Sequence, residues 1–344
     1  MTAPEQASGV PEQASGVPEV RELGRGVWAW MPPFAGWGHT NIGLVAGDGG
    51  ALLIDTPWDV DRARAVLAGL GPRLGSTPVA TVFNTHCDGD HWWGNAAVPG
   101  AEIVSAQATL AAMKAEPGPE EVDRLRRLAS LTGRVPGRAG RMGRYVAAML
   151  DPFAFERVTL RYPDRTFTAR REETVGGRDV VFIELGGAHS PSDSVVLVPD
   201  ARVVFCGDLL FARATPIMWH GPPTAWMAAL EAITALPADT FVSGHGVLST
   251  RDELTALHRY WSWLADGVAT HRAAGRGVGE TVRRLAASPQ FAAFREWDSP
   301  ERLYVNVATT ARRLDGKGPM PTDPVTRTRL FDGIAGLADQ LAGR

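Results

Sequence analysis

The stretch NTHCDGDHWWGN at residues 84–95 places four side chains that can bind a metal within six positions, directly after an apolar segment. These side chains are His86, Asp88, Asp90 and His91. Imidazole and carboxylate together suit a divalent transition ion, and each added carboxylate shifts the preference toward harder metals. The stretch therefore predicts a metal site in a loop that follows a strand.

Three more candidate ligands occur downstream, each at the end of a segment that reads as a strand. His189 follows VVFIELGGA, Asp208 follows ARVVFCG, and His245 follows TFVSG. A single His or Asp is usually structural, but seven of them in one repeated strand-then-ligand arrangement argue against coincidence. The sequence thus predicts one metal centre assembled from four strand ends.

The segments around the first ligand loop alternate between strand and helix patterns. Residues 41–47 and 51–56 read as strands joined by a tight turn, and residues 59–70 have helical spacing that we expect Gly71-Pro72 to end. Short apolar strands follow at 79–85 and 101–106. This alternation indicates an α/β fold.

The rest of the chain contains further strands and two helical regions. Strands are predicted at residues 166–169, 179–185, 194–199, 201–207 and 240–244, with a helix at 224–236. Residues 105–150 form a mostly helical insertion, and residues 251–344 form a helical extension. We expect one domain, residues 21–344, preceded by a flexible tail, residues 1–20, in which PEQASGV occurs twice.

The order and setting of the ligands resemble the metallo-β-lactamase superfamily, whose motif is His-x-His-x-Asp-His followed by a distant His, Asp and His. The likeness spans roughly residues 36–250 and implies an αββα sandwich with the metals at one edge, between the sheets. It implies one metal on His86, residue 88 and His189, and another on Asp90, His91 and His245, with Asp208 bridging. Asp90 would also be the catalytic proton acceptor.

The chain departs from that motif at one position, where Asp88 replaces the second histidine. A carboxylate there makes the site less positive, so two divalent ions per chain are expected to be zinc or iron, with manganese as a further candidate. Flavodiiron proteins of the same superfamily resemble this arrangement, although their carboxylate is Glu. Asp88 is either a ligand or a group that orients a ligand imidazole by hydrogen bonding.

Three residues near the ligand segments are candidates for contacting the substrate. Trp93 follows the first ligand loop, and His39 and His220 lie in loops expected to border the pocket. A core position for Trp93 and a surface position for the histidines are the alternatives.

Composition limits the class of partner. The chain has 344 residues, 44% of them hydrophobic, and a formal net charge of −3. This balance disfavours a nucleic-acid or membrane partner and favours a small-molecule substrate. Two cysteines and the lack of a secretory or membrane-spanning segment predict a cytoplasmic protein.

Three functions are consistent with these patterns. The first is a hydrolase that uses a metal-bound hydroxide on an ester-like, lactone, thioester or related bond. The second is a diiron or dimanganese redox enzyme that activates oxygen or peroxide on the same fold. The third is a degenerate, non-enzymatic protein in which Asp88 has disabled one metal site.

Overall fold

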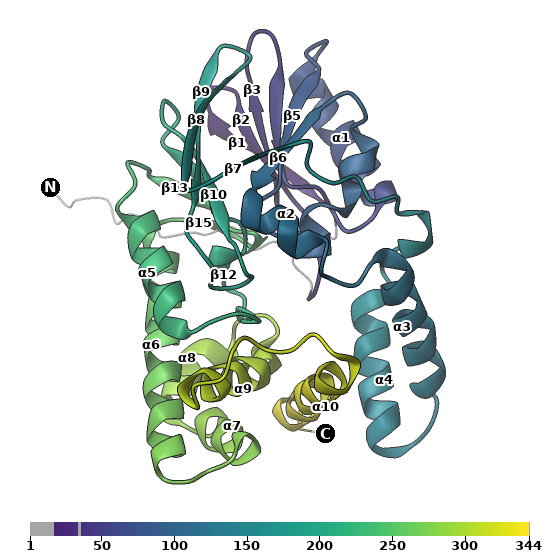
Figure 1. Ribbon diagram of the computed structural model, residues 1–344, viewed down its shortest axis with the longest axis vertical. Helices are drawn as coiled ribbons and strands as arrows, with labels where there is room; N and C mark the ends of the chain where they lie inside the picture. Colours follow the sequence, from purple (N-terminus) through teal and green to yellow (C-terminus); the bar gives the residue numbers. More distant parts are fainter. Residues whose placement is uncertain (1–16, 34–35, 344) are drawn as a thin grey trace, which may run out of the picture.

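The computed structural model describes residues 17–33 and 36–343, and its strands form two facing sheets with helices outside them (Figure 1). Most of the predicted tail, including nearly all of its repeat, lies outside the described residues. The first strand nevertheless begins at Glu19, inside the segment predicted to be tail.

The first sheet has seven strands in the order β1-β2-β3-β4-β5-β6-β7. Their bounds are Glu19–Gly24, Val27–Met31, Ile42–Ala46, Ala51–Ile54, Val79–Phe83, Glu102–Ala106 and Arg165–Phe167. Strands β1 to β4 pair antiparallel, whereas β4 to β7 pair parallel. The carboxyl ends of the parallel strands therefore meet at one edge, which is where open sheets place their sites.

The second sheet has six strands in the order β15-β13-β11-β10-β9-β8. In chain order β8 to β11, β13 and β15 span Arg170–Val175, Arg178–Glu184, Ser194–Val198, Val203–Phe205, Thr240–Val242 and Leu248–Ser249. A separate parallel pair, β12 (Phe211–Ala212) and β14 (His245–Gly246), sets Phe211 opposite His245.

Alternation along the strands builds the layers. In β4, Leu52 and Ile54 face the other sheet, whereas Ala51 and Leu53 pack toward α1 (Val60–Leu74). On the far side, α5 (Pro223–Thr234) and α6 (Arg251–Ala273) cover the second sheet. The layers are thus helix, sheet, sheet and helix, which confirms the predicted αββα sandwich.

Helix α1 does not end at Gly71-Pro72 as predicted. It continues through Pro72 to Leu74, where Gly75 caps it with a positive φ of 57°. A proline removes only one backbone donor, and the last turn of this helix accommodates that loss.

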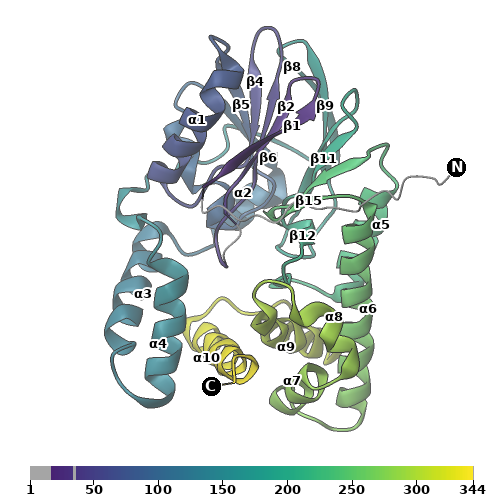
Figure 2. The same ribbon diagram turned by 180° about the vertical axis from the view of Figure 1, so that it is seen from behind.

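A helical layer lies beyond the edge of the sandwich. The insertion forms α2 (Gln107–Met113), α3 (Pro119–Thr132) and α4 (Gly137–Leu150). The C-terminal region adds α7 (Val278–Ala286), α8 (Ala292–Arg295), α9 (Leu303–Leu314) and α10 (Pro324–Leu341). Helix α10 lies between α4 and α9 in both views (Figures 1 and 2), so the end of the chain returns to the insertion.

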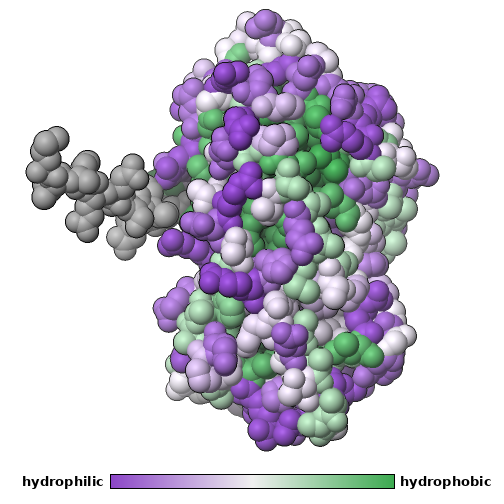
Figure 3. All heavy atoms as spheres, turned by 90° about the vertical axis from the view of Figure 1, so that its left-hand side faces the viewer, coloured by the Kyte–Doolittle hydropathy of each residue, from purple (hydrophilic) through white to green (hydrophobic). Residues whose placement is uncertain are grey.

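The surface formed by β8, β9, α5 and α6 is mixed in character. Its largest area of apolar side chains lies in the upper half, over the sheets, whereas the helical half mixes hydrophilic residues with smaller apolar areas (Figure 3). Among the described helices, none combines the length and the apolar character needed to cross a bilayer.

Candidate metal centre and active site

Four histidines converge at one edge of the sandwich, and a hydrogen bond at Nδ1 holds each imidazole ring in place. In His86, Nδ1 lies 3.0 Å from Thr85 Oγ1, and in His91 it lies 2.8 Å from Asp55 Oδ2. In His189, Nδ1 lies 2.6 Å from the carbonyl oxygen of Ile217, and in His245 it lies 3.0 Å from that of His39. Thr85 Oγ1 donates to Asp55, so it accepts from His86. Each Nδ1 is thus a donor, which leaves the Nε2 lone pairs free to bind a metal.

Six of the seven predicted ligands form two groups. His86, His189 and Asp208 form one group, and Asp90, His91 and His245 form the other. Within each group the donor atoms lie within 4.8 Å of one another.

Asp208 lies between the two groups. Its carboxylate oxygens are 3.2 Å from His91 Nε2, 3.3 Å from His245 Nε2 and 3.5 Å from His189 Nε2. This position, in contact with histidines of both groups, is the one that a bridging carboxylate occupies.

Two orphaned atoms test whether this site fits a metal. His86 Nε2 and Asp208 Oδ1 are buried and have no hydrogen-bond partner. Buried polar atoms are nearly always paired, and a cation would bind both of these lone pairs. A set of imidazoles and carboxylates also suits zinc, iron or manganese, so the residues present fit the predicted group.

The electrostatics of the site favour positive charge at its centre. Burial acts to lower the pKa of His189, but the Asp88 and Asp208 carboxylates outweigh it and raise that pKa to about 10. Burial also acts to lower the pKa of His245, but Asp208 and Asp90 outweigh it and raise that pKa to about 9. A dication bound between these imidazoles would replace the protons that the raised pKa values favour.

Asp88 lies beside the first group, although it is not part of the tight cluster. Its Oδ2 is 3.1 Å from His189 Nε2, and its side chain is 27% exposed. The carboxylate is therefore within reach of the site, and its role as a ligand stays a prediction.

Two aspartates that the sequence reading did not select hold the ligand loops in place. Asp55 accepts from His91, from Thr85 Oγ1 and from the Thr85 backbone N–H. Asp193 accepts from the backbone N–H groups of Ala188, His189 and Ser190.

Each of these aspartates had a local signal in the sequence. Asp55 ends the strand LLIDT, and Asp193 lies four residues after a ligand in a turn-rich segment. Burial raises the pKa of Asp193 to about 6, with His189 and the N–H donors opposing it.

The site opens into a chamber of about 400 Å³. Asp88, Asp90, Asp208 and His245 lie at its floor. Its walls are mostly apolar and come from the sandwich, the insertion and the C-terminal region. They include Trp37, Trp58, Trp93, Val122, Leu125, Met142, Val146, Met149, Leu150, Phe211, Ile217, Trp219, Pro324 and Phe331.

Of the three residues predicted to contact the substrate, one lines the chamber and two do not. Trp93 is buried and lines the chamber. His39 does not line it; its carbonyl holds His245, and its ring lies 5.5 Å from that of Phe153. His220 is also outside the lining, with its backbone N–H bonded to His189 O at 3.2 Å.

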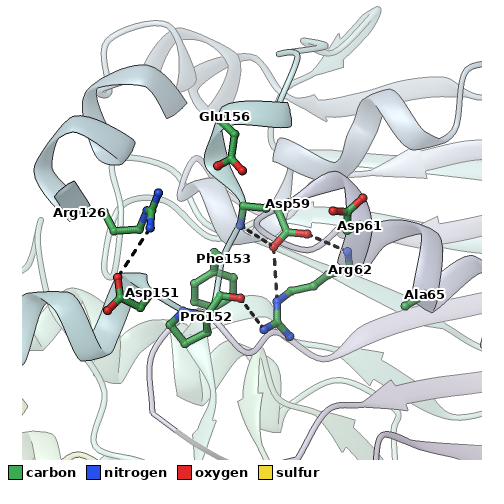
Figure 4. A pocket seen from close by; sticks show the side chains of 10 residues that line it. Asp59, Asp61, Arg62, Ala65, Arg126, Asp151, Pro152, Phe153 and Glu156 are labelled. Atoms are coloured by element: carbon green, nitrogen blue, oxygen red, sulfur yellow. Dashed lines mark hydrogen bonds and ion pairs between the residues drawn. The ribbon is translucent and has the colours of Figure 1, made fainter. Parts of the chain in front are cut away.

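A second hollow, of about 540 Å³, lies between α1 and the α3–α4 pair (Figure 4). Four of its charged side chains pair with each other: Arg62 with Asp59 at 3.5 Å, and Arg126 with Asp151 at 3.8 Å. None of the seven predicted ligands lines it. The chamber over the histidines is therefore the candidate active site.

Comparison with known proteins agrees with this geometry. The family model of the metallo-beta-lactamase superfamily matches residues 35–245, more than half of the chain. The chain belongs to the metallo-β-lactamase superfamily. All seven predicted ligands lie within or at the end of the matched segment.

The curated relatives match only part of this chain, which is a member of the superfamily. A hydroxyacylglutathione hydrolase of Brucella ovis is 39% identical over 77 residues, which is 22% of this chain and 30% of that enzyme. A hydroxyacylglutathione hydrolase of Brucella anthropi is 33% identical over 112 residues, 32% of this chain and 42% of that enzyme. The chain thus spans less than half the length of these relatives.

Solved structures share the fold over more of the chain. The stereoselective inverting sec-alkylsulfatase Pisa1 from Pseudomonas sp. has a TM-score of 0.65 at 17% identity, covering 86% of this chain and 50% of that one. A metallo-beta-lactamase from Pontibacter korlensis has a TM-score of 0.50 at 20% identity, covering 71% and 99%. At these identities the likeness shows the fold alone.

Proposed function

We propose that the chain is a metal-dependent hydrolase that cleaves an ester, thioester or lactone bond in a small molecule. One observation carries this proposal: two groups of potential metal-binding side chains, both in contact with Asp208, lie at the floor of a mostly apolar chamber. Such a chamber accepts an organic substrate and places it directly over the metals.

The residues that would hold the metals follow from the two groups. His86, His189 and Asp208 would hold one, with Asp88 as a further ligand, and Asp90, His91 and His245 would hold the other. Two bound dications lower the pKa of a water molecule and polarise a carbonyl group. The Nδ1 hydrogen bonds keep the imidazoles oriented for this role.

Asp90 is the residue best placed to move a proton. Its carboxylate lines the chamber, accepts from Thr40 Oγ1 at 3.3 Å and lies 3.4 Å from His245 Nε2. In this proposal Asp90 accepts a proton from the attacking water and passes it to the leaving group. The tryptophans and Phe211 keep other water away from the reacting bond.

The partial likeness to hydroxyacylglutathione hydrolases supports a hydrolytic reaction and makes thioesters one class to test. The carboxylate of Asp88 is the observation that favours the second candidate, a redox enzyme with iron or manganese.

The test combines metal content with turnover. Protein purified without added metal or chelator is analysed by elemental mass spectrometry, then assayed with 4-nitrophenyl esters, acyl thioesters and lactones. We expect about two divalent ions per chain and hydrolysis of at least one class, lost in His91→Ala. Two iron ions, an oxo-bridged ferric absorption band and no hydrolysis would favour the redox enzyme.

A further inference from the structure

Arg302 is a buried cation in the wall of the chamber. Its side chain is part of the lining, yet the residue is only 2% exposed. It ends a 3₁₀ turn, Pro300–Arg302, which follows Ser299 in the left-handed region at φ 53°. The backbone of Asp298 fixes this turn to the segment after β12, because it bonds to Arg213 O and Thr215 N at 2.9 Å each.

The guanidinium group has few partners. Nη1 donates to Thr215 O at 3.1 Å, and Nη2 donates to Gly36 O at 3.3 Å. Nε is buried and has no acceptor. A guanidinium carries five N–H donors, so only part of its capacity is used.

No carboxylate of residues 17–33 and 36–343 lies within ion-pair distance of Arg302. The two acidic residues next to it in sequence are engaged elsewhere. Asp298 accepts from the Gly36 N–H, and Glu301 accepts from the Tyr145 hydroxyl at 2.8 Å.

Aromatic rings compensate part of the charge and connect it to the metal centre. The guanidinium carbon lies 4.3 Å from the centroid of the Trp37 ring and 5.8 Å from that of Phe211. Phe211 in turn stacks on the His245 ring at 5.3 Å and 25°. Arg302 therefore lies one aromatic ring away from a predicted metal ligand.

A buried charge without a counterion is costly, and cation–π contacts replace only part of the lost hydration. Because Arg302 lines the chamber, an anion bound in the chamber can approach this group. We propose that the substrate is an amphiphilic anion, whose carboxylate or similar oxyanion binds Arg302 while its apolar body fills the chamber. The identification of this anion as the substrate rests on the proposed function, whereas the anion-binding site itself can be tested without turnover.

The apolar body follows from the rest of the chamber lining. Met149 and Leu150 of α4 and Phe331 of α10 face the same chamber as Arg302. An anionic group on a hydrocarbon or aryl body would match both surfaces, whereas a small polar molecule would leave the apolar wall against water.

Two fluorescent probes with the same ring system test the site directly. One is 8-anilinonaphthalene-1-sulfonate, and the other is N-phenyl-1-naphthylamine, which lacks the sulfonate. Both are titrated into the metal-loaded wild type, Arg302→Met and Arg302→Lys. We expect the wild type to favour the sulfonate, Arg302→Met to lose about tenfold or more of that affinity, and Arg302→Lys to keep most of it. The neutral probe should bind all three proteins alike.

Two results would overturn the proposal. One is equal binding of the two probes by the wild type. The other is a loss of affinity for both probes in the same proportion in Arg302→Met. That result would give Arg302 a structural role, in which it holds the backbone of Thr215 and Gly36. Mono-4-nitrophenyl adipate and 4-nitrophenyl hexanoate extend the test to turnover: the anionic ester should show a raised KM in Arg302→Met, and the neutral ester should not. If neither ester is cleaved while the probes behave as expected, the proposed hydrolysis fails and the anion site stands.

Discussion

The carboxylate of Asp55 lies 2.8 Å from Nδ1 of His91, and it also accepts from both the backbone N–H and the hydroxyl of Thr85. Through Thr85, the same carboxylate is connected to Nδ1 of His86 at 3.0 Å. One buried aspartate at the end of β4 therefore orients a predicted ligand of each metal.

Asp55→Asn should weaken metal binding by about 10- to 100-fold while the fold is retained, because the amide orients His91 less strongly than the carboxylate. Asn is the suitable replacement because Asp55 has a φ of 64°, a conformation that Asn tolerates. Competition with a chromophoric chelator measures the affinity, and the exposed Asp48→Asn is the control. Equal affinity in both variants would remove Asp55 from the site.

Asp208→Ala should abolish hydrolysis and reduce the bound metal to about one ion per chain or less, because the carboxylate contacts both groups. Elemental mass spectrometry and circular dichroism check the metal content and the fold. Asp200→Ala, an exposed partner of Arg178, serves as the matched control. Full metal content in Asp208→Ala would contradict the bridging role.

Asp88→His restores the usual motif and should raise zinc affinity by about tenfold or more, because imidazole is a better zinc ligand than a short carboxylate. Zinc and iron titrations of the two proteins give both the affinity and the preference. An unchanged preference would mean that Asp88 is not a ligand.

Phe331→Ala should enlarge the chamber, since Phe331 lines it and lies 6.1 Å from the Trp37 ring. We expect the ratio of kcat/KM for 4-nitrophenyl decanoate over the hexanoate to rise by about tenfold. Val325→Ala, on the same helix but exposed, should leave this ratio unchanged. A similar shift in both variants would argue against Phe331 as a chamber wall.

The docking of α10 on α4 should depend on pH through Asp332. Hydrogen bonding to Arg138, with a smaller contribution from Arg141, lowers the pKa of Asp332 in the folded state. A lowered pKa contributes stability above the ordinary aspartate value of about 4 and loses it as the pH falls through the folded-state value.

Asp332→Asn should therefore lower the Tm by about 1–3 °C at pH 7 and leave it equal to that of the wild type well below pH 4. Calorimetric scans at the two pH values check the prediction. A constant difference at both values would show that the charge of Asp332 is not the cause.

The convergence of the candidate ligands was predictable because they follow apolar strands, and short buried strands are easily recognised. Strand β8 was missed because its sequence, RREETV, is charged; it lies at the edge of its sheet and depends on backbone pairing with β9. The two-residue strands β12 and β14 carry no periodicity at all.

The chamber was not predictable, because residues far apart in sequence form it. Arg302 and Phe331 line the same chamber as the predicted metal ligands only when α10 packs between α4 and the turn Pro300–Arg302. No local pattern distinguishes them from ordinary helix residues. The roles of Asp55 and Asp193 depend in the same way on partners brought together by the sheets.

The position of α10 in the chain sets an order of events during synthesis. His245, the last predicted ligand, leaves the ribosome well before Pro324–Leu341 does. The predicted set of ligands is therefore complete in the nascent chain before α10 has been made. In the proposed hydrolase, the wall that α10 contributes to the chamber would therefore be added after the metal ligands.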